Sequence, residues 1–96
     1  MSAWVYVLAS RPRGTLYVGV TTDLRRRVQE HREEQRRGFT KAYRVKRLVH
    51  YEHYDRNIDA IQREKNIKHW PRQWKMDLVE AANPKWRDLW NDIASP

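Results

Sequence analysis

The stretch that decides the fold is Thr15-Leu-Tyr-Val-Gly-Val-Thr-Thr-Asp-Leu-Arg-Arg-Arg-Val-Gln-Glu-His31. Its first six residues alternate apolar and other side chains, which is the period of two of a half-buried strand. Thr21-Thr22-Asp23 then offers side chains that cap a helix N-terminus. In the helix that follows, Arg27 and His31 lie four residues apart and therefore on one face. A cation and an imidazole are thus predicted side by side near a strand that carries a tyrosine, which indicates a site.

The stretch is flanked by further strand and helix signals. Residues 3–8 are predicted to form a strand, and the Pro and Gly in 10–14 predict a turn, so residues 3–20 form a hairpin. The helix is expected to run from Asp23 to Arg37 and to end at Gly38. Residues 39–44 are expected to form a loop.

The second half predicts one more strand and three helices. Residues 45–54 are aromatic and β-branched, which favours a strand. A helix through His69 is capped by Asp55 or Asn57, and Pro71 opens the next helix. That helix is expected to place three residues on one side: Trp74, Leu78 and Ala81. The last helix, about 84–94, is predicted from an amphipathic face: Trp86, Leu89, Trp90 and Ile93. The fold class is therefore α+β, a small three-stranded antiparallel sheet flanked by helices.

Length and composition set the limits of this prediction. The 96 residues suit a single domain spanning 1–96, with a motif-bearing core at about 3–80. There is no cysteine, which excludes disulfides and thiolate metal sites. The four histidines lack the spacing of a metal-ligand motif. No apolar run has the length of a membrane span and no signal peptide is evident, so we expect a soluble, cytoplasmic protein.

The positive charge is concentrated in the first half of the chain. Residues 1–50 hold twelve Lys and Arg against four Asp and Glu, whereas residues 51–96 hold eight of each. The net charge of +8 therefore lies in the first half, and arginine outnumbers lysine fourteen to six. This distribution favours a nucleic acid as partner over an ordinary soluble surface, because arginine forks suit phosphate groups.

Glu64 is the most informative residue of the second half. On a helix it lies within or beside an apolar stripe that includes Ile61 and Ile67. Because burying an unpaired carboxylate is costly, such a group has either a cationic partner or a metal. The alternative to a metal site is an ordinary salt bridge to Lys65 or Lys68, and spacing alone does not decide between the two.

Two tyrosines of the hairpin allow a geometric test. For Tyr6 and Tyr17 to share a site, their side chains must lie on one face of the sheet. The numbers of paired residues must then sum to an odd value, as with Ser10 opposite Thr15.

Several short motifs together resemble a known family. They are Trp4-Val5-Tyr6, Tyr17-Val18-Gly19, Asp23-Leu-Arg-Arg-Arg27, His31 and Arg63-Glu64-Lys65. In this order they resemble the GIY-YIG endonuclease domain, most closely its small stand-alone bacterial members. The first glycine of the family name is Trp4 here and each isoleucine is a valine. We find no convincing match for the downstream asparagine of several members.

The resemblance implies roles for single residues in a DNA endonuclease of repair or processing. Tyr6 and Tyr17 would line the site, with a tyrosine as base, and His31 would assist Tyr6. Arg27 would contact the scissile phosphate. Glu64 would hold Mg²⁺ or Mn²⁺, which a single carboxylate with phosphate oxygens and water suits.

DNA is the expected partner. Gly19 is expected to leave space beside the tyrosines for the DNA backbone, and a bulge or close packing at this glycine is compatible with that role. Basic side chains would track the phosphates: Arg25, Arg26, Arg36, Lys41, Arg44, Lys46 and Arg47. Two rival functions stay open: a non-catalytic nucleic-acid-binding module, and an interaction domain or homo-oligomer that uses the Trp86 and Trp90 face.

Overall fold

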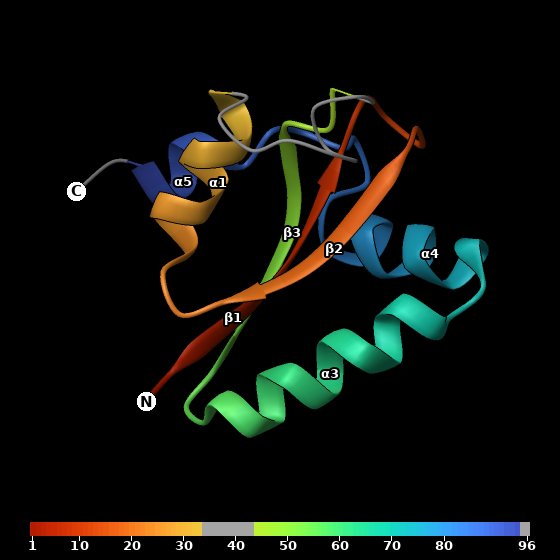
Figure 1. Cartoon of the computed structure of the whole chain (residues 1–96). Coiled ribbons are helices and arrows are strands. Elements are labelled where there is room, and N and C mark those ends of the chain that lie inside the picture. The colour runs from red at the N-terminus through yellow and green to blue at the C-terminus, as the bar shows by residue number, and fades with distance from the viewer. Residues whose placement is uncertain (34–43, 95–96) are drawn as a thin grey trace.

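The computed structural model describes residues 1–33 and 44–94, which form a three-stranded antiparallel sheet with helices on both faces (Figure 1). The strands are β1 (Ala3–Ala9), β2 (Leu16–Thr21) and β3 (Arg47–Tyr54), in the spatial order β2-β1-β3. The helices are α1 (Leu24–Arg32), α3 (Asn57–His69), α4 (Arg72–Ala82) and α5 (Trp90–Ala94). The predicted α+β class and the three strands are confirmed.

Strand β1 lies at the centre of two hydrophobic cores because it is covered on both faces. Its odd-numbered residues, such as Val5 and Val7, pack with α3 and α4. Its even-numbered Tyr6 and Leu8 pack with α1 and α5 on the other face. The sheet therefore separates the molecule into an α1 side and an α3 side, which Figure 1 shows to the left and to the lower right of the strands.

The hairpin has the register that a shared tyrosine site requires. Tyr6 pairs with Gly19 and Leu8 pairs with Tyr17, so the paired numbers sum to an odd value. The backbone N–H of Ser10 donates to the carbonyl of Thr15, as expected for the last pair before the turn. Tyr6 and Tyr17 therefore lie on one face, the α1 face, and this prediction is confirmed.

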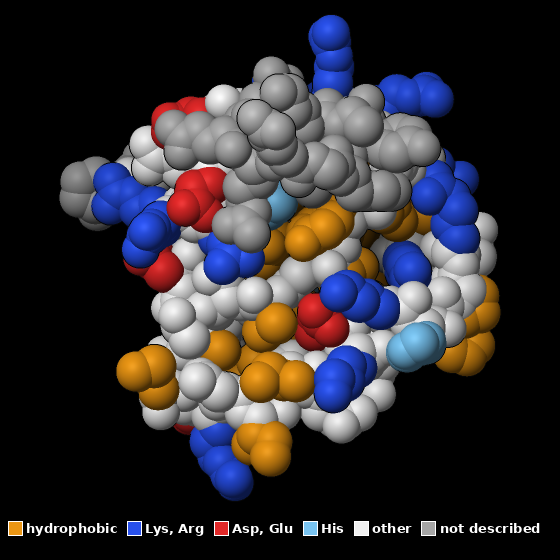
Figure 2. Space-filling model, viewed as in Figure 1, with side chains coloured by type: hydrophobic (Ala, Val, Ile, Leu, Met, Phe, Trp, Pro, Cys, Tyr) orange, Lys and Arg blue, Asp and Glu red, His pale blue; other side chains and the backbone are white. Residues whose placement is uncertain are grey.

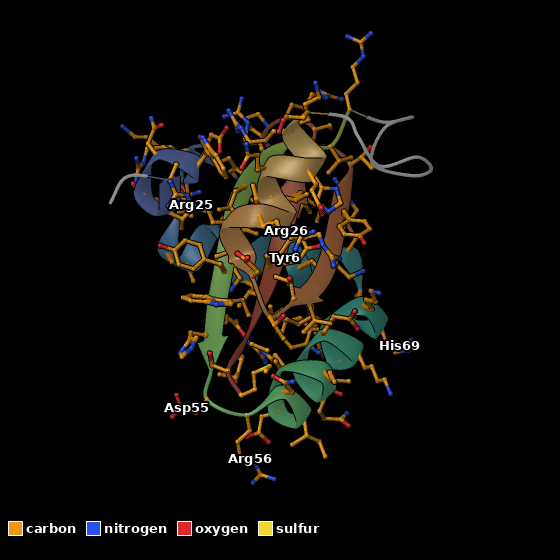
Figure 3. All side chains as sticks on the ribbon, turned by 60° about the vertical axis from the view of Figure 1, so that its left-hand side comes forward. Tyr6, Arg25, Arg26, Asp55, Arg56 and His69 are labelled. Atoms are coloured by element: carbon orange, nitrogen blue, oxygen red, sulfur yellow. The ribbon has the colours of Figure 1, made fainter. Side chains whose placement is uncertain are left out.

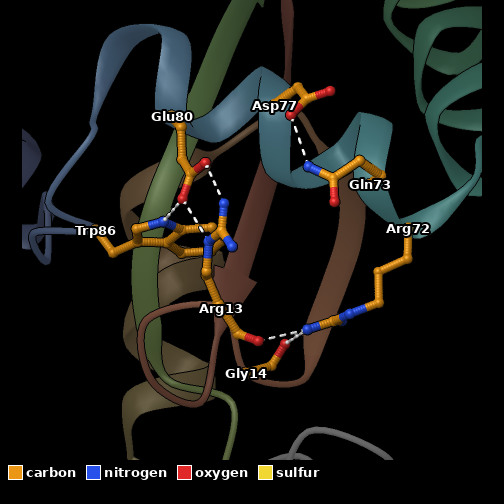
Figure 4. Close-up of polar contacts among 7 residues, drawn as sticks. All are labelled: Arg13, Gly14, Arg72, Gln73, Asp77, Glu80 and Trp86. Carbon is orange, nitrogen blue, oxygen red and sulfur yellow. Dashed lines mark hydrogen bonds and ion pairs between the residues drawn. The ribbon is translucent and has the colours of Figure 1, made fainter.

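The turn of the hairpin is anchored to α4 (Figure 4). The guanidinium of Arg13 donates to both carboxylate oxygens of Glu80, at 2.8 and 2.9 Å. Glu80 also accepts a 2.7 Å hydrogen bond from the indole N–H of Trp86. Arg72 donates to the backbone carbonyls of Arg13 and Gly14. These contacts join segments far apart in the sequence and fix the turn that sets the register of β2.

The bounds of α1 and β3 differ from those expected from the sequence. Helix α1 is capped by Asp23, whose carboxylate accepts from the N–H of Arg26 at 3.2 Å, and it ends at Arg32. Its predicted continuation to Arg37 and Gly38 and the predicted loop at 39–43 lie outside the described residues. Strand β3 begins at Arg47 and not at residue 45, and its register against β1 shifts between Val7 and Leu8.

Helix α3 begins after Arg56, whose side chain makes no capping hydrogen bond. The predicted cap at Asp55 or Asn57 is therefore wrong, and Asn57 is the first helical residue.

Of the three residues predicted to lie on one side of α4, Leu78 packs against the core and Ala81 is exposed. The side of α4 that meets the core also carries the buried Val79 and the partly buried Met76. Trp74 is instead 56% exposed, with its ring edge-on to Trp70 at 6.0 Å between centroids. The helix is oriented by its packing across β3, which its own periodicity does not specify.

The predicted C-terminal helix over 84–94 is shorter than expected. Only Trp90–Ala94 is helical, because the Asn83 amide organises a turn before it. The Asn83 side chain accepts from the N–H of Arg87 and donates to the carbonyls of Arg87 and Val49. Trp86, at φ 55°, is consequently buried in the core on the α3 side, whereas Trp90 packs on the α1 side. The two tryptophans do not share a face, so the predicted interaction surface is wrong.

Within residues 1–33 and 44–94, no helix combines the length and the apolar character needed to cross a bilayer.

Candidate active site

Four of the side chains singled out from the sequence meet on the α1 face of the sheet. Tyr6 comes from β1, Tyr17 from β2, and Arg27 and His31 from α1. The Tyr6 hydroxyl lies 3.3 Å from Nε2 of His31. The Tyr17 ring lies 6.2 Å from the Tyr6 ring and 5.3 Å from the His31 ring, between centroids. In Figure 3, Tyr6 lies at the centre of the molecule beside the helix that carries Arg25 and Arg26.

The two tyrosines differ in their access to solvent. Tyr6 is fully buried and His31 is 4% exposed, whereas Tyr17 is half-buried. Burial, reinforced by the neighbouring Tyr17, raises the pKa of the Tyr6 hydroxyl above its ordinary value, although Arg27 acts in the opposite direction. A buried phenol with a raised pKa stays protonated at neutral pH.

Gly19 is explained by the Tyr6 ring. A Cβ atom at Gly19 would lie 2.5 Å from both Cζ and the hydroxyl oxygen of Tyr6. The space on the Cβ side of Gly19 is thus filled by that ring, which is the close packing that the sequence also allowed. The expected contact of Gly19 with DNA stays a prediction.

Arg27 borders two adjoining cavities at the end of β2. One, of about 250 Å³, is polar, and its lining includes Thr22, Arg26 and Glu30. The other, of about 260 Å³, reaches across the end of the sheet to Asn57 and Ile61 of α3. Arg27 pairs with Glu30 at 3.4 Å and its side chain is 33% exposed. The arginine is therefore held in place and still has access to a ligand.

Glu64 lies on α3, along the side that carries the buried Ala60 and Ile67. Its side chain is 13% exposed, and it forms a 3.0 Å ion pair with Lys68 one helical turn away. The salt bridge that the sequence left open is thus present. Glu64 follows Ile61 by three residues, so it continues the side of α3 that borders the second Arg27 cavity. Within the described ranges, no group of three or more Asp, Glu, His or Cys side chains is arranged to hold a metal ion.

The other predicted DNA-binding residues fall into separate places. Arg25 and Arg26 are exposed on α1. Arg44 and Lys46 line another cavity, of about 410 Å³, together with Arg32, Arg47 and Asp88. Arg36 and Lys41 lie outside the described residues. In the view of Figure 2, Lys and Arg side chains surround the face turned to the viewer, and acidic side chains lie among them. Apolar side chains gather over the first half of α3, where Ile58 and Ile61 are exposed.

Two residues that line the cavities, Glu30 and Asn57, were not among the site residues expected from the sequence. Glu30 pairs with both Arg26 and Arg27, which the spacing of four and three residues on a helix signals. Asn57 was considered only as a cap, although it lines the cavity that Arg27 shares with α3. No sequence signal connects Asn57 to Arg27, because they belong to helices on different faces of the sheet.

The sequence of the chain also matches a known family. The sequence model of the GIY-YIG catalytic domain matches residues 2–77. The chain belongs to the GIY-YIG family. This is a family of nucleases that act on DNA and generally use divalent metals. The resemblance inferred from Tyr6, Tyr17 and Glu64 with their neighbours is thereby confirmed at the level of the family.

Small relatives resemble nearly the whole chain. A UPF0213 protein of Haloquadratum walsbyi is 38% identical over 71% of this chain and 76% of its own length. A UPF0213 protein of Staphylococcus aureus is 35% identical over 82% of this chain and 95% of its own length. The solution structure of the UPF0213 protein BH0048 from Bacillus halodurans covers both chains completely, with 26% identity and a TM-score of 0.59. The GIY-YIG domain here therefore has the size of small stand-alone relatives.

Proposed function

We propose that this chain is a divalent-metal-dependent endonuclease that hydrolyses a phosphodiester bond in DNA. The observation that carries the proposal is the position of Arg27 and Tyr17 together. Arg27 borders two cavities, and the partly exposed Tyr17 lies beside the buried pair of Tyr6 and His31. Membership of the GIY-YIG family supports the reaction type.

The different burial of the tyrosines divides their roles. Tyr17 is half-buried and is the tyrosine that an attacking water can reach, whereas Tyr6 supports it from the core. As water forms its bond to phosphorus, it passes a proton to the Tyr17 oxygen, and the bond from phosphorus to the leaving 3′ oxygen breaks. As the Tyr17 oxygen accepts the proton from water, the phenol proton of Tyr17 passes to the adjacent imidazole of His31. Solvent water protonates the leaving oxygen.

Arg27 is the residue that stabilises charge on the phosphate. A guanidinium fixed by Glu30 and aimed into a cavity can donate to two phosphate oxygens at once. Negative charge increases on these oxygens in the transition state, so the contact lowers the barrier.

Glu64 is the residue proposed to hold the metal. A mostly buried carboxylate is a hard oxygen donor, and Mg²⁺ or Mn²⁺ needs only one or two of these when phosphate and water supply the rest. Its partner Lys68 is 49% exposed, and a surface ion pair of this kind contributes little, so it can yield to a divalent cation. When bound, the cation would polarise a phosphate oxygen and favour departure of the 3′ oxygen.

The test is cleavage of linear, nicked, branched and single-stranded DNA with Mg²⁺ or Mn²⁺. Branched substrates also address the expected setting in DNA repair or processing. Wild type should cleave only with a divalent cation, and Glu64→Gln should reduce the rate by orders of magnitude, since an amide is a poor ligand for a hard cation. The unfolding free energy of Glu64→Gln should stay within about 1 kcal/mol of wild type.

A melting experiment separates a metal ligand from a salt-bridging residue. Mg²⁺ should raise the melting temperature of wild type more than that of Glu64→Gln. Arg87→Ala, an exposed substitution in the turn before α5, should cleave like wild type and serves as the control. Wild-type cleavage by Glu64→Gln would refute its role as ligand.

A non-catalytic DNA-binding module is the second candidate. The ion pair of Glu64 with Lys68 favours it, because a carboxylate that keeps its lysine partner does not take up a metal. DNA binding without cleavage of any substrate in the panel would support this function over the endonuclease.

A further inference from the structure

A third cavity adjoins the Arg27 site on the α1 face. It has a volume of about 400 Å³ and shares Thr22 and Asp23 with the polar Arg27 cavity. The rest of its lining comes from three elements that flank it: Trp4 and Tyr51 of the sheet, Leu24 and Arg25 of α1, and Asp92 and Ile93 of α5. A ligand that lies against Arg27 can therefore extend directly into this cavity.

Aromatic rings from two strands form one wall. Trp4 contacts two rings of β3, with its ring centroid 4.5 Å from that of His53 and 6.0 Å from that of Tyr51. Trp4 and Tyr51 pack against the core beneath them and still line the cavity. Because Trp4 stands where the family motif is named for a glycine, this wall is a departure of the chain from the motif and not part of the shared catalytic set.

Polar groups complete the lining of this aromatic wall. Arg25 is an exposed cation on the first turn of α1 and suits a phosphate. The carboxylates of Asp23 and Asp92 are acceptors for the exocyclic amino groups of bases. A flat apolar wall with a cation and acceptors around it matches the parts of a nucleotide.

We propose that this cavity holds one unpaired base of the DNA strand whose backbone passes Arg27, with the base stacked on Trp4. The proposal rests on the proposed function, since it assumes DNA at Arg27. The volume is in the range of about 300–1,000 Å³ that small-ligand sites occupy. A base in a duplex has both faces covered by its neighbours, so only an unpaired base can offer a face to Trp4. The preferred substrate is then DNA with an unpaired nucleotide beside the scissile phosphate, as in a flap, loop or branch.

The experiment compares two DNAs that differ at one position. One carries an unpaired nucleotide next to the cleavage site, and the other carries an abasic sugar there, so that the backbone charge is the same. Binding is measured by fluorescence anisotropy in EDTA, where no cleavage occurs. Trp4→Leu removes the aromatic face but keeps apolar packing, and Trp4→Phe keeps a smaller aromatic face. Trp74→Leu is the control, since Trp74 is an exposed tryptophan of α4 on the other side of the sheet. Melting curves verify folding.

The expected result is specific to the base. Trp4→Leu should weaken binding of the base-bearing DNA by about tenfold and that of the abasic DNA by less than about twofold. Trp4→Phe should recover most of the loss, and Trp74→Leu should bind like wild type. Equal weakening for both DNAs, or equal effects of Trp4→Leu and Trp74→Leu, would overturn the stacking proposal.

Failure of the nuclease proposal gives a different pattern. If Trp4→Leu weakens binding of the base-bearing DNA alone but wild type cleaves neither DNA in Mg²⁺ or Mn²⁺, base stacking stands and catalysis does not. If it cleaves both equally well and Trp4→Leu changes nothing, catalysis stands and base stacking does not.

Discussion

The two faces of the sheet carry clusters built from the same four residue types. On the α1 side they are Tyr6, His31, Arg27 and Glu30. On the α3 side they are Tyr54, His50, Arg63 and Glu52. The residue types alone do not show which cluster is a site, but the geometry separates the two.

The α3-side cluster is closed. Oε1 of Glu52 accepts from Tyr54 at 2.8 Å and from Arg63 at 3.0 Å. Oε2 accepts from Arg63 at 3.1 Å and lies 2.8 Å from His50, and the guanidinium also covers the Trp70 ring. Burial alone would raise the pKa of the Glu52 carboxyl, but these hydrogen bonds outweigh it and lower the pKa to about 2.

The α1-side cluster is open by comparison. The contact of Tyr6 with His31 is long, at 3.3 Å, and Arg27 borders two cavities. Burial raises the pKa of Tyr6, and the opposite effect of Arg27 is too small to offset it. A cluster that satisfies itself stabilises the fold, whereas one that faces a cavity with a fixed cation is prepared for a ligand.

The largest expected effect contrasts the two arginines. Arg27→Ala should reduce DNA cleavage by about 10²–10³-fold with little change in melting temperature, because it removes charge stabilisation of the phosphate. Arg63→Ala should lower the unfolding free energy by about 2–3 kcal/mol, because it removes hydrogen bonds to the Glu52 carboxylate, and should leave cleavage by the folded protein close to wild type. Cleavage rates per folded molecule and chemical denaturation check both. Equal losses of cleavage in the two variants would end the distinction between the clusters.

The second prediction uses pH to test the closed cluster. Because the folded pKa of Glu52 is about 2 and its ordinary value is 4.5, the carboxylate contributes stability that is complete above pH 4.5 and is lost as pH falls toward 2. The difference in unfolding free energy between wild type and Glu52→Gln should therefore shrink by about 3 kcal/mol over this range. Glu80, whose hydrogen bonds to Arg13 and Trp86 also lower its pKa to about 2, is present in both proteins and cancels. Denaturation at several pH values gives the curve, and a constant difference would contradict it.

The third prediction concerns the packing of the Tyr6 ring against Gly19. Gly19→Ala should destabilise the protein by about 1–3 kcal/mol, because the new methyl group displaces the Tyr6 ring. Tyr6→Leu removes the far end of the ring, so adding Gly19→Ala to it should cost much less. A double-mutant cycle by denaturation measures this coupling. Additive effects would show that Tyr6 does not need the space above Gly19.

The smallest expected effect separates the charged surfaces around the clusters. Changing Arg25 and Lys46 to Glu should weaken DNA binding. It should also reduce the slope of log K against log salt concentration by the equivalent of up to about two phosphate contacts. Reversing Lys85 and Arg87, two exposed residues before α5, should change binding less. Titrations at several salt concentrations provide the comparison. Equal slopes for the two double variants would show that the charge of the first half has no bearing on where DNA binds.

The local features of this fold follow directly from the sequence. The alternation in β1 and β2 and the turn between them fixed which residues share a face. The register that places Tyr6 and Tyr17 on the same face of the sheet was therefore predictable. The Asp23 cap followed from side-chain chemistry. Helical spacing predicted the buried Ile67 of α3, whereas Ile61 of the predicted apolar stripe is 42% exposed. Such features depend on neighbours within a few residues, whose geometry the chain fixes locally.

Which side chains are buried and which border a cavity on each face of the sheet depends on the tertiary structure. Trp86 and Trp90 have helical spacing, yet the Asn83 turn sends them to opposite sides of the sheet. Tyr6 and Tyr17 both belong to the motifs that resemble the family. Tyr6 is nevertheless fully buried beneath α1, whereas Tyr17 is half-buried on the edge strand β2. The closed Glu52 cluster and the open Arg27 cluster likewise have the same composition. Burial and cavities arise where elements distant in sequence pack together, and local periodicity does not encode which elements these are.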